Sequence, residues 1–206
     1  MSVLDQLASA LGRNDERPNV ELAEKLAASG DKTAIAELIV ALGGKSAVAN
    51  DAIKTLYEIG ERKPELITAH AEAFFAALKS KNNRLVWGGM TALDTIAAIA
   101  APALAARLPE ILAAAEKGSV IAKDKAVSIL CELVAVDERA KALPPLFDML
   151  RAAAVNQLPS YAESASTVIG ADRAKLADLI SARLPDVPQP AKRTRLVKVL
   201  QKLAKG

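Results

Sequence analysis

Apolar positions recur along the chain at intervals of 37 residues. Three segments fall into this register: VANDAIKTLYEI (48–59), LVWGGMTALDTI (85–96) and AKDKAVSILCEL (122–133). In each of them a small residue, a leucine and another aliphatic residue are spaced i, i+4, i+7, which places all three on one face of a helix. The positions are held by Ala52, Leu56 and Ile59, by Gly89, Leu93 and Ile96, and by Ala126, Leu130 and Leu133. The pattern therefore predicts three helices that pack through equivalent faces.

Two less regular copies of this segment follow. SYAESASTVIG (160–170) and AKRTRLVKVLQKL (191–203) carry the equivalent residues Ala162, Ser166 and Ile169, and Leu196, Leu200 and Leu203. Partner segments with their own apolar stripes lie between the copies, at 31–42, 64–79, 103–116, 138–153 and 172–183. Asp31 and Asp172 are suited to cap the N-termini of two of these partner helices.

The predicted fold class is all-α, an α-solenoid of about five stacked helix pairs. Residues 20–206 are expected to form the repeat array, and residues 1–19 a short N-terminal helix with the linker NDERPN (14–19). The composition supports this expectation, because the chain is 51% hydrophobic but only 3% aromatic. Its core must be filled by alanine, leucine, isoleucine and valine, and small side chains let helices approach closely.

Residue types that carry metal or nucleophile chemistry are scarce. The single cysteine, Cys131, and the single histidine, His70, exclude a disulfide framework, a Cys/His zinc site and a His-pair metal site. GGKS (43–46) is similar to the end of a phosphate-binding loop, but the first glycine of that pattern would fall at Ile39, inside a predicted helix with no strand before it. We therefore predict neither a metal nor a cofactor.

The sequence indicates neither a membrane-spanning helix nor a signal peptide. The longest apolar run, 96–106, is interrupted by Pro102 and is shorter than the roughly 20 residues of a membrane span. The segment MSVLDQLASALGR has an acidic residue at Asp5 and no basic start, unlike a signal peptide. A cytoplasmic protein without a membrane span is expected.

The positive charge of the chain is concentrated at its C-terminal end. The net charge is +3, but residues 191–206 contain six basic residues and no acid, which leaves 21 basic and 24 acidic residues, a net of −3, in the first 190. The body is thus not a nucleic-acid-binding surface by charge. The basic C-terminal helix is interpreted first as the polar cap of the array, and alternatively as a weak contact for an anionic partner.

The segment RLPEILAAAEKGSVIAKDKAVSILCEL (107–133) resembles the HEAT/armadillo repeat superfamily, with Lys123, Ala126 and Leu130 in the basic, alanine and leucine slots of the second helix. ALPPLFDML (142–150) is similar to the first helix of such a repeat, and the resemblance extends over residues 20–206. KSKNNRLVWGGMTALDTIA (79–97) also looks like small bacterial HEAT-like proteins of unassigned function. Ala49 or Val86 stands in the basic slot of other copies, so the Arg/Asp ladder of the superfamily is expected to be largely absent. The resemblance implies that second helices line a concave surface.

Polar and aromatic side chains gather on another face of these second helices. Trp87, Thr91 and Asp94 are spaced i, i+4, i+7, off the apolar stripe, and Trp87 is in register with Asn50 and Asp124. The candidate concave-surface site comprises Asn50, Lys54, Asn83, Arg84, Trp87, Thr91, Asp94, Lys123 and Asp124. Trp87 is interpreted either as a platform in a binding groove or as a wedge between repeats for which Gly88 and Gly89 make room.

Two functions fit these features. The first is a non-catalytic scaffold whose concave surface holds a segment of an unidentified protein partner. The second is a HEAT-like enzyme or nucleic-acid-binding protein, by analogy with HEAT-like DNA glycosylases and pigment lyases, that uses Trp87, Arg84 and Asp94. A glycosylase groove should be strongly basic, and the body of this chain is slightly acidic. The sequence therefore favours the scaffold over an enzyme.

Overall fold

The structure, a computed structural model, describes residues 2–205. Within this range the chain forms 12 α-helices and five short 3₁₀ turns, and no residue is in a β-strand. The chain divides into two compact units, the N-terminal unit (residues 1–126) and the C-terminal unit (residues 127–206). Helix α8 (Val120–Ala135) contributes residues to both units. The predicted all-α repeat fold is confirmed, and each unit is described by itself.

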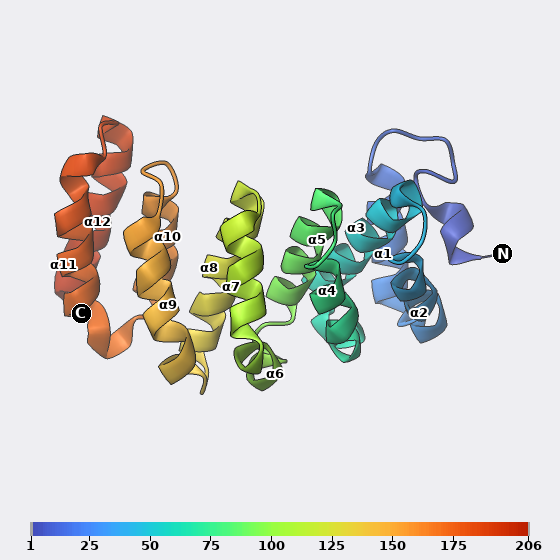
Figure 1. The fold of residues 1–206 in the computed structure, drawn as a ribbon, viewed down its shortest axis with the longest axis horizontal. Helices are drawn as coiled ribbons and strands as arrows, with labels where there is room; N and C mark the ends of the chain where they lie inside the picture. Colours follow the sequence, from blue (N-terminus) through green and yellow to red (C-terminus); the bar gives the residue numbers. More distant parts are fainter. Residues whose placement is uncertain (1, 206) are drawn as a thin grey trace. The chain divides into compact units, whose positions relative to one another are not determined.

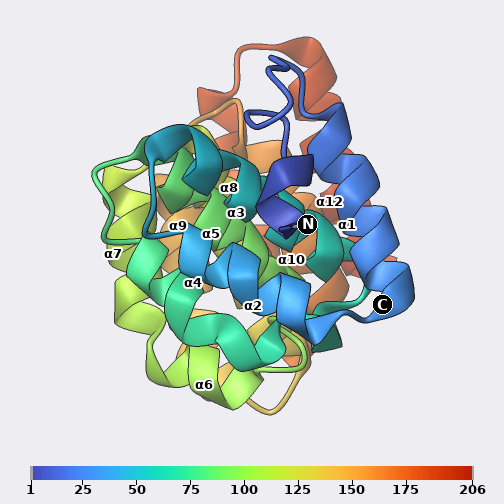
Figure 2. The same cartoon turned by 90° about the vertical axis from the view of Figure 1, so that its right-hand side faces the viewer.

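The N-terminal unit is built from helix pairs. After a 3₁₀ turn at Val3–Gln6, its helices are α1 (Arg17–Ser29), α2 (Lys32–Ala41), α3 (Ser46–Arg62), α4 (Ala71–Ala77), α5 (Asn83–Thr95), α6 (Ala101–Ala106) and α7 (Leu108–Lys117). Helix α3 packs between α1 and α5, so these three helices form one row (Figure 1). Helix α2 packs on α3 and α4 packs on α5, and Figure 2 shows the same helices from the N-terminal end.

The C-terminal unit repeats this arrangement with α9 (Arg139–Ala152), α10 (Leu158–Val168), α11 (Arg173–Arg183) and α12 (Pro190–Lys205). Helix α10 packs on α12, and both contact α11. Two arginines close helix ends in this unit. Arg183 donates to the carbonyls of Leu150 and Ala153 at the end of α9, at 3.2 and 2.9 Å, and Arg139 donates to the carbonyl of Val168 at the end of α10, at 3.0 Å. These bonds occupy carbonyls that a helix C-terminus leaves without amide partners.

The predicted packing face is confirmed in the three regular copies. All nine of its residues are buried: Ala52, Leu56, Ile59, Gly89, Leu93, Ile96, Ala126, Leu130 and Leu133. At Gly89 a Cβ atom would lie 3.0 Å from the carbonyl oxygen of Phe74, and at Gly88 it would lie 2.7 Å from Cγ1 of Ile53. The missing side chains thus allow α4 to approach Gly89 and α3 to approach Gly88 closely.

Two of the predicted partner helices are not continuous. The segment predicted at 64–79 forms 3₁₀ turns at Pro64–Leu66 and Thr68–His70 before α4 begins. The segment predicted at 103–116 is split between α6 and α7, and Pro109 lies in the first turn of α7. A proline removes an amide donor and disfavours helical backbone at the preceding residue, so a helix tends to begin there.

The predicted caps have different outcomes. The carboxylate of Asp31 accepts hydrogen bonds from the backbone amides of Thr33 and Ala34 at 3.1 and 3.0 Å, which confirms it as the N-cap of α2. Asp172 precedes α11 but makes no capping hydrogen bond. Its carboxylate pairs instead with Arg139 and Lys175, at 2.7 and 2.8 Å. Hydrogen bonds from Lys175 and Arg139 lower the pKa of Asp172.

A buried polar network attaches the N-terminal segment to α1 and α3. Asn19, which is fully buried, accepts from the amide of Ala8 at 2.9 Å and donates to Asp51 at 2.8 Å. The other carboxylate oxygen of Asp51 accepts from the amide of Ser9 at 2.7 Å. Helix α1 begins at Arg17, inside the segment 14–19 expected to be a linker, and the domain boundary at residues 19 and 20 stays a prediction.

None of the helices within residues 2–205 is long and apolar enough to span a bilayer. In the same range no three His, Cys, Asp or Glu side chains come together in a group that could bind a metal ion.

Candidate functional site

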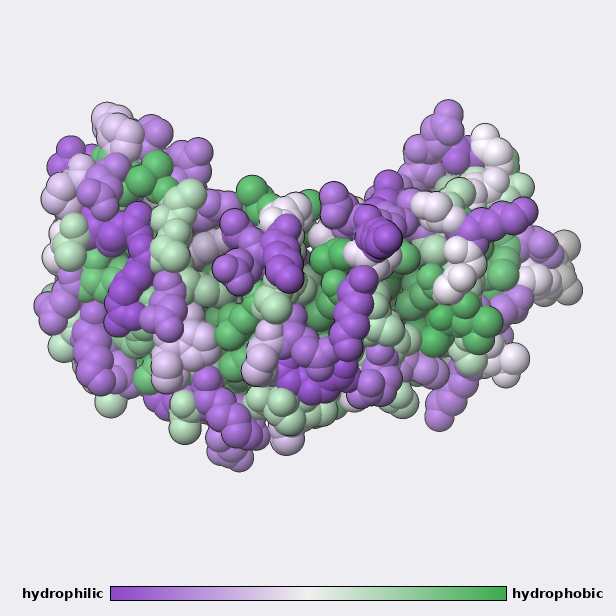
Figure 3. Space-filling model, viewed as in Figure 1, coloured by the Kyte–Doolittle hydropathy of each residue, from purple (hydrophilic) through white to green (hydrophobic). Residues whose placement is uncertain are grey.

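The nine candidate residues all lie in the N-terminal unit. Asn50 and Lys54 are on α3, Lys123 and Asp124 are near the start of α8, and the other five are on α5. Because α3 packs directly on α5, the structure brings the α3 residues next to the first half of α5. The space-filling view of Figure 3 shows patches of hydrophobic residues bordered by hydrophilic ones on the visible face.

An aromatic pair joins α3 to α5. The ring centroids of Tyr57 and Trp87 are 6.0 Å apart, with the planes tilted by 50°. Tyr57 is buried, whereas Trp87 is half-buried and keeps part of its surface accessible. A cation accompanies each ring: Nζ of Lys54 is 4.7 Å from the centre of the Tyr57 ring, and Cζ of Arg84 is 5.9 Å from that of Trp87.

Lys54 is a largely enclosed charge, with 12% of its side chain exposed. Its Nζ lies 2.6 Å from Glu58 on the same helix and 3.5 Å from Glu16, the N-cap residue of α1. Burial alone would lower the pKa of Lys54, but hydrogen bonds with Glu58 and Tyr57 outweigh it, so the pKa is raised. Lys54 is therefore a fixed positive charge at neutral pH.

Carboxylates surround the two cations. Glu16 also forms an ion pair with Arg84, so it joins α1 to both α3 and α5. Glu58 in turn binds Arg62 at 2.6 Å, and Arg62 reaches Glu24 on α1 at 3.1 Å. Burial alone would raise the pKa of Glu58, but its hydrogen bonds with Lys54 and Arg62 lower it below the ordinary value. The surface along α1, α3 and α5 thus carries alternating, mutually paired charges.

Two asparagines fix the start of α5 against α3. The side chain of Asn82 accepts from the amide of Arg84 at 3.0 Å, which makes Asn82 the N-cap of α5. Its amide nitrogen donates to Asn50 at 2.8 Å and to the hydroxyl of Ser46 at 3.2 Å. Asn83 is exposed and lines a surface hollow of about 400 Å³ together with Lys79, Glu110 and other residues of α5, of α7 and of the segment that follows α4. Asn50, Lys54, Arg84 and Trp87 are thus together, and Asn83 belongs to a different depression.

The second half of the candidate set extends away from Trp87. Thr91 is only 5% exposed, and its hydroxyl donates to the carbonyl of Trp87 at 2.9 Å. Asp94 forms an ion pair with Lys125 of α8 at 2.8 Å. Lys123 and Asp124 are exposed near the start of α8.

Residues outside the predicted set complete the site. Glu16 lies in the segment expected to be a linker, outside the repeat register, so no pattern indicated it. The expectation that the Arg/Asp ladder of the superfamily is largely absent stays a prediction. Ion pairs do connect neighbouring second helices, as Glu24–Arg62 and Asp94–Lys125, but from positions other than the basic slot of the superfamily.

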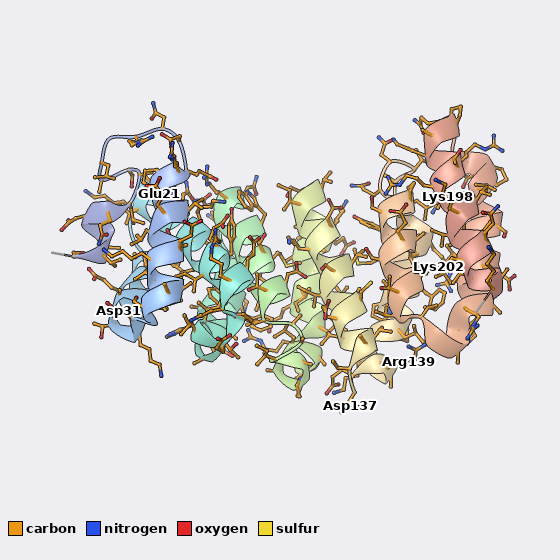
Figure 4. All side chains as sticks on the ribbon, turned by 180° about the vertical axis from the view of Figure 1, so that it is seen from behind. Glu21, Asp31, Asp137, Arg139, Lys198 and Lys202 are labelled. Atoms are coloured by element: carbon orange, nitrogen blue, oxygen red, sulfur yellow. The ribbon has the colours of Figure 1, made fainter. Side chains whose placement is uncertain are left out.

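The basic C-terminal helix has similar contacts within its own unit. Arg195 on α12 binds Glu163 on α10 at 2.6 Å, and this hydrogen bond lowers the pKa of Glu163. Leu196, Val199 and Leu203 are buried on the apolar face of α12. Lys198 and Lys202, both labelled in Figure 4, are exposed.

No protein-family model and no curated protein matches the sequence. Solved structures with a similar backbone do exist. An engineered protein of known crystal structure aligns with a TM-score of 0.61 at 19% identity, over 100% of this chain and 98% of its own. A designed armadillo repeat protein aligns with a TM-score of 0.59 at 17% identity, over 97% of this chain and 99% of its own. At these identities the likeness concerns the fold. Together with the helix pairs described above, it shows that the chain has a HEAT/armadillo-like helical-repeat fold.

Proposed function

We propose that the chain is a non-catalytic scaffold that binds a segment of a partner protein on the surface formed by α3 and α5. The observation that carries this proposal is the half-buried Trp87, packed against Tyr57 and flanked by Arg84. Tryptophan, tyrosine and arginine are the residues most enriched among those that dominate binding energy at protein interfaces. An aromatic ring already held by its neighbours loses little conformational entropy when a ligand packs on it.

The alternative enzyme or nucleic-acid reader has less support. That function would use Trp87, Arg84 and Asp94 as one group, but Asp94 pairs with Lys125. The cations beside the aromatic pair are each matched by a carboxylate, Glu16 or Glu58. Phosphate contacts need uncompensated Lys and Arg side chains, so this surface suits a protein segment better than a nucleic acid. A weak anionic contact through exposed lysines of α12, such as Lys198, remains part of the proposal.

The test compares partner capture by the wild-type chain and by Trp87→Ala, followed by measurement of Kd with the purified partner. We expect Trp87→Ala to weaken binding by about tenfold or more, the effect of removing an aromatic anchor. Val40→Ala is the matched control, since Val40 is an apolar side chain on α2 that is 78% exposed. Equal binding by wild type and Trp87→Ala, with both proteins folded by circular dichroism, would refute the proposal.

A further inference from the structure

The carboxylate of Glu16 holds a position between the two cations of the candidate site. One of its oxygens pairs with Nη2 of Arg84 on α5, and the other lies 3.5 Å from Nζ of Lys54 on α3. Glu16 itself belongs to neither helix, because it is the N-cap residue of α1. A single carboxylate at the start of α1 thus contacts cations on both α3 and α5.

The position of α1 does not depend on this carboxylate. Pro18 and Asn19, just after Glu16, are buried, and Asn19 is bonded to Asp51 at 2.8 Å. The neighbouring charges Asp15 and Arg17 are exposed and make pairs within their own segment, with Arg13 and Glu21. The Glu16 side chain is 41% exposed. It can therefore leave the two cations while α1 stays packed on α3.

Arg84 is incompletely satisfied by Glu16. Its Nε atom is buried and has no hydrogen-bond partner within the described part of the chain. A guanidinium binds a carboxylate best through two parallel hydrogen bonds, and in the side-on arrangement these come from Nε and one Nη. Glu16 contacts Nη2, so a carboxylate that approaches side-on and engages both Nε and Nη2 would bind more strongly.

The charges around the site leave room for one additional carboxylate only when Glu16 moves away. The cations Lys54, Arg62 and Arg84 are matched by Glu16, Glu24 and Glu58. If Glu16 moves away, one positive charge is left uncompensated next to the accessible part of Trp87. This arrangement suits an acidic side chain with an apolar neighbour, whereas a polyanion would meet the remaining carboxylates.

We propose that Glu16 is an internal stand-in for a glutamate or aspartate side chain of the bound segment, which displaces it and pairs with Arg84 and Lys54 beside Trp87. The partner segment is thus a peptide with an acidic residue next to an apolar one. This inference rests on the proposed function of the same surface and specifies its ligand.

The experiment selects a random dodecapeptide display library on Glu16→Gln. Peptides that emerge should contain an acidic residue beside an apolar or aromatic one. The strongest, synthesised with acetylated and amidated ends and a fluorescent label, should bind Glu16→Gln about tenfold more tightly than wild type by anisotropy. The double variant Glu16→Gln/Arg84→Gln should lose this gain. Glu21→Gln, which removes an exposed carboxylate elsewhere on α1 (labelled in Figure 4), should bind like wild type.

Several results would overturn the inference. Selected peptides that are basic or uncharged, equal affinities for wild type and Glu16→Gln, or tighter binding of single-stranded DNA than of the peptide would each do so. Failure of this inference can be separated from failure of the proposed function. If basic or neutral peptides bind and change the emission of Trp87, the surface is a peptide site with a different ligand. If no peptide of any charge binds or changes that emission, both proposals fail.

Discussion

Glycine at position 88 illustrates how a single missing Cβ sets the distance between two helices. A Cβ there would lie 2.7 Å from Cγ1 and 3.0 Å from Cγ2 of Ile53, a buried β-branched residue on α3. Such a side chain has few rotamers available, so it cannot move aside easily. The contact between α3 and α5 therefore depends on a residue without a side chain.

We expect Gly88→Ala to lower the free energy of unfolding by about 1–2 kcal/mol. The helix gains about 1 kcal/mol from alanine, but overpacking against Ile53 costs more, about 2–3 kcal/mol. Urea unfolding followed by circular dichroism measures the change. Gly43→Ala is the control, because its new Cβ would have only an ordinary contact, 3.7 Å from the carbonyl of Val40. A Gly88→Ala protein at least as stable as wild type would contradict the packing argument.

At this scale the sequence predicts the buried stripe well and the polar site only in part. The stripe follows from spacing alone, since hydrophobic side chains at i, i+4 and i+7 must share a face. The sequence pattern places Thr91 with the accessible column, because Thr91 is polar and lies off the apolar stripe. In a helix, however, a threonine hydroxyl can bond to the carbonyl four residues earlier, and Thr91 does so while buried. Glu16 could not be found, since its role depends on a tertiary contact from outside the repeat.

At the scale of elements, prolines affect the helices according to burial. Pro109 has no amide hydrogen to donate to the carbonyl of Ala105, and Ala105 is buried. Helix α6 therefore ends at Ala106, and a separate helix, α7, begins at Leu108. Pro144 and Pro145 lie inside α9, where the affected residues Ala140 and Lys141 are exposed and water can reach their carbonyls. The sequence shows where prolines stand, but which of them interrupts a helix depends on tertiary burial.

Ionic contacts at the centre of α3 predict a pH dependence of stability. The pKa of Glu58 in the folded state lies below its ordinary value of 4.5, because hydrogen bonds with Lys54 and Arg62 outweigh the effect of burial. The unfolded chain therefore takes up this proton at a higher pH than the folded chain. The contribution of the carboxylate to stability is complete above about pH 4.5 and is lost as the pH falls through the folded-state pKa.

Glu58→Gln should accordingly be less stable than wild type by about 1–2 kcal/mol at pH 7, and the difference should narrow between about pH 5 and pH 3. Urea titrations at several pH values give both quantities. The control Glu21→Gln, on the exposed side of α1, should differ little from wild type at any pH. A difference for Glu58→Gln that stays constant or widens on acidification would contradict the assignment.

For the whole molecule, the two compact units and the repeat fold imply that stability is a sum of neighbour contacts. Removal of residues 190–206 takes away the buried face of α12, formed by Leu196, Val199 and Leu203. The apolar surfaces of α10 and α11 that α12 covers become exposed. The C-terminal unit should then lose stability and the protein should tend to aggregate.

The single tryptophan lies in the N-terminal unit and reports on that unit alone. In the truncated chain we expect the urea transition seen by circular dichroism to begin at lower denaturant, while the midpoint of Trp87 fluorescence changes little. Lys198→Gln, an exposed charge change on α12, should leave both transitions in place and so separate the loss of charge from the loss of apolar cover. A monomeric truncation with unchanged stability would show that α12 is not a cap.

The side-chain contacts between neighbouring second helices also limit how the repeats of this chain can be rearranged or duplicated. Asn50 meets Asn82 through paired amides, whereas Asp94 meets Lys125 through opposite charges. Each junction therefore has its own chemistry, and the two halves of one junction are supplied by successive repeats. Exchange of the repeats that carry α3 and α5 would separate Asn50 from Asn82 and Asp94 from Lys125. These contacts therefore favour one order of the repeats. A duplicated segment should be tolerated only where it contains both members of such a pair.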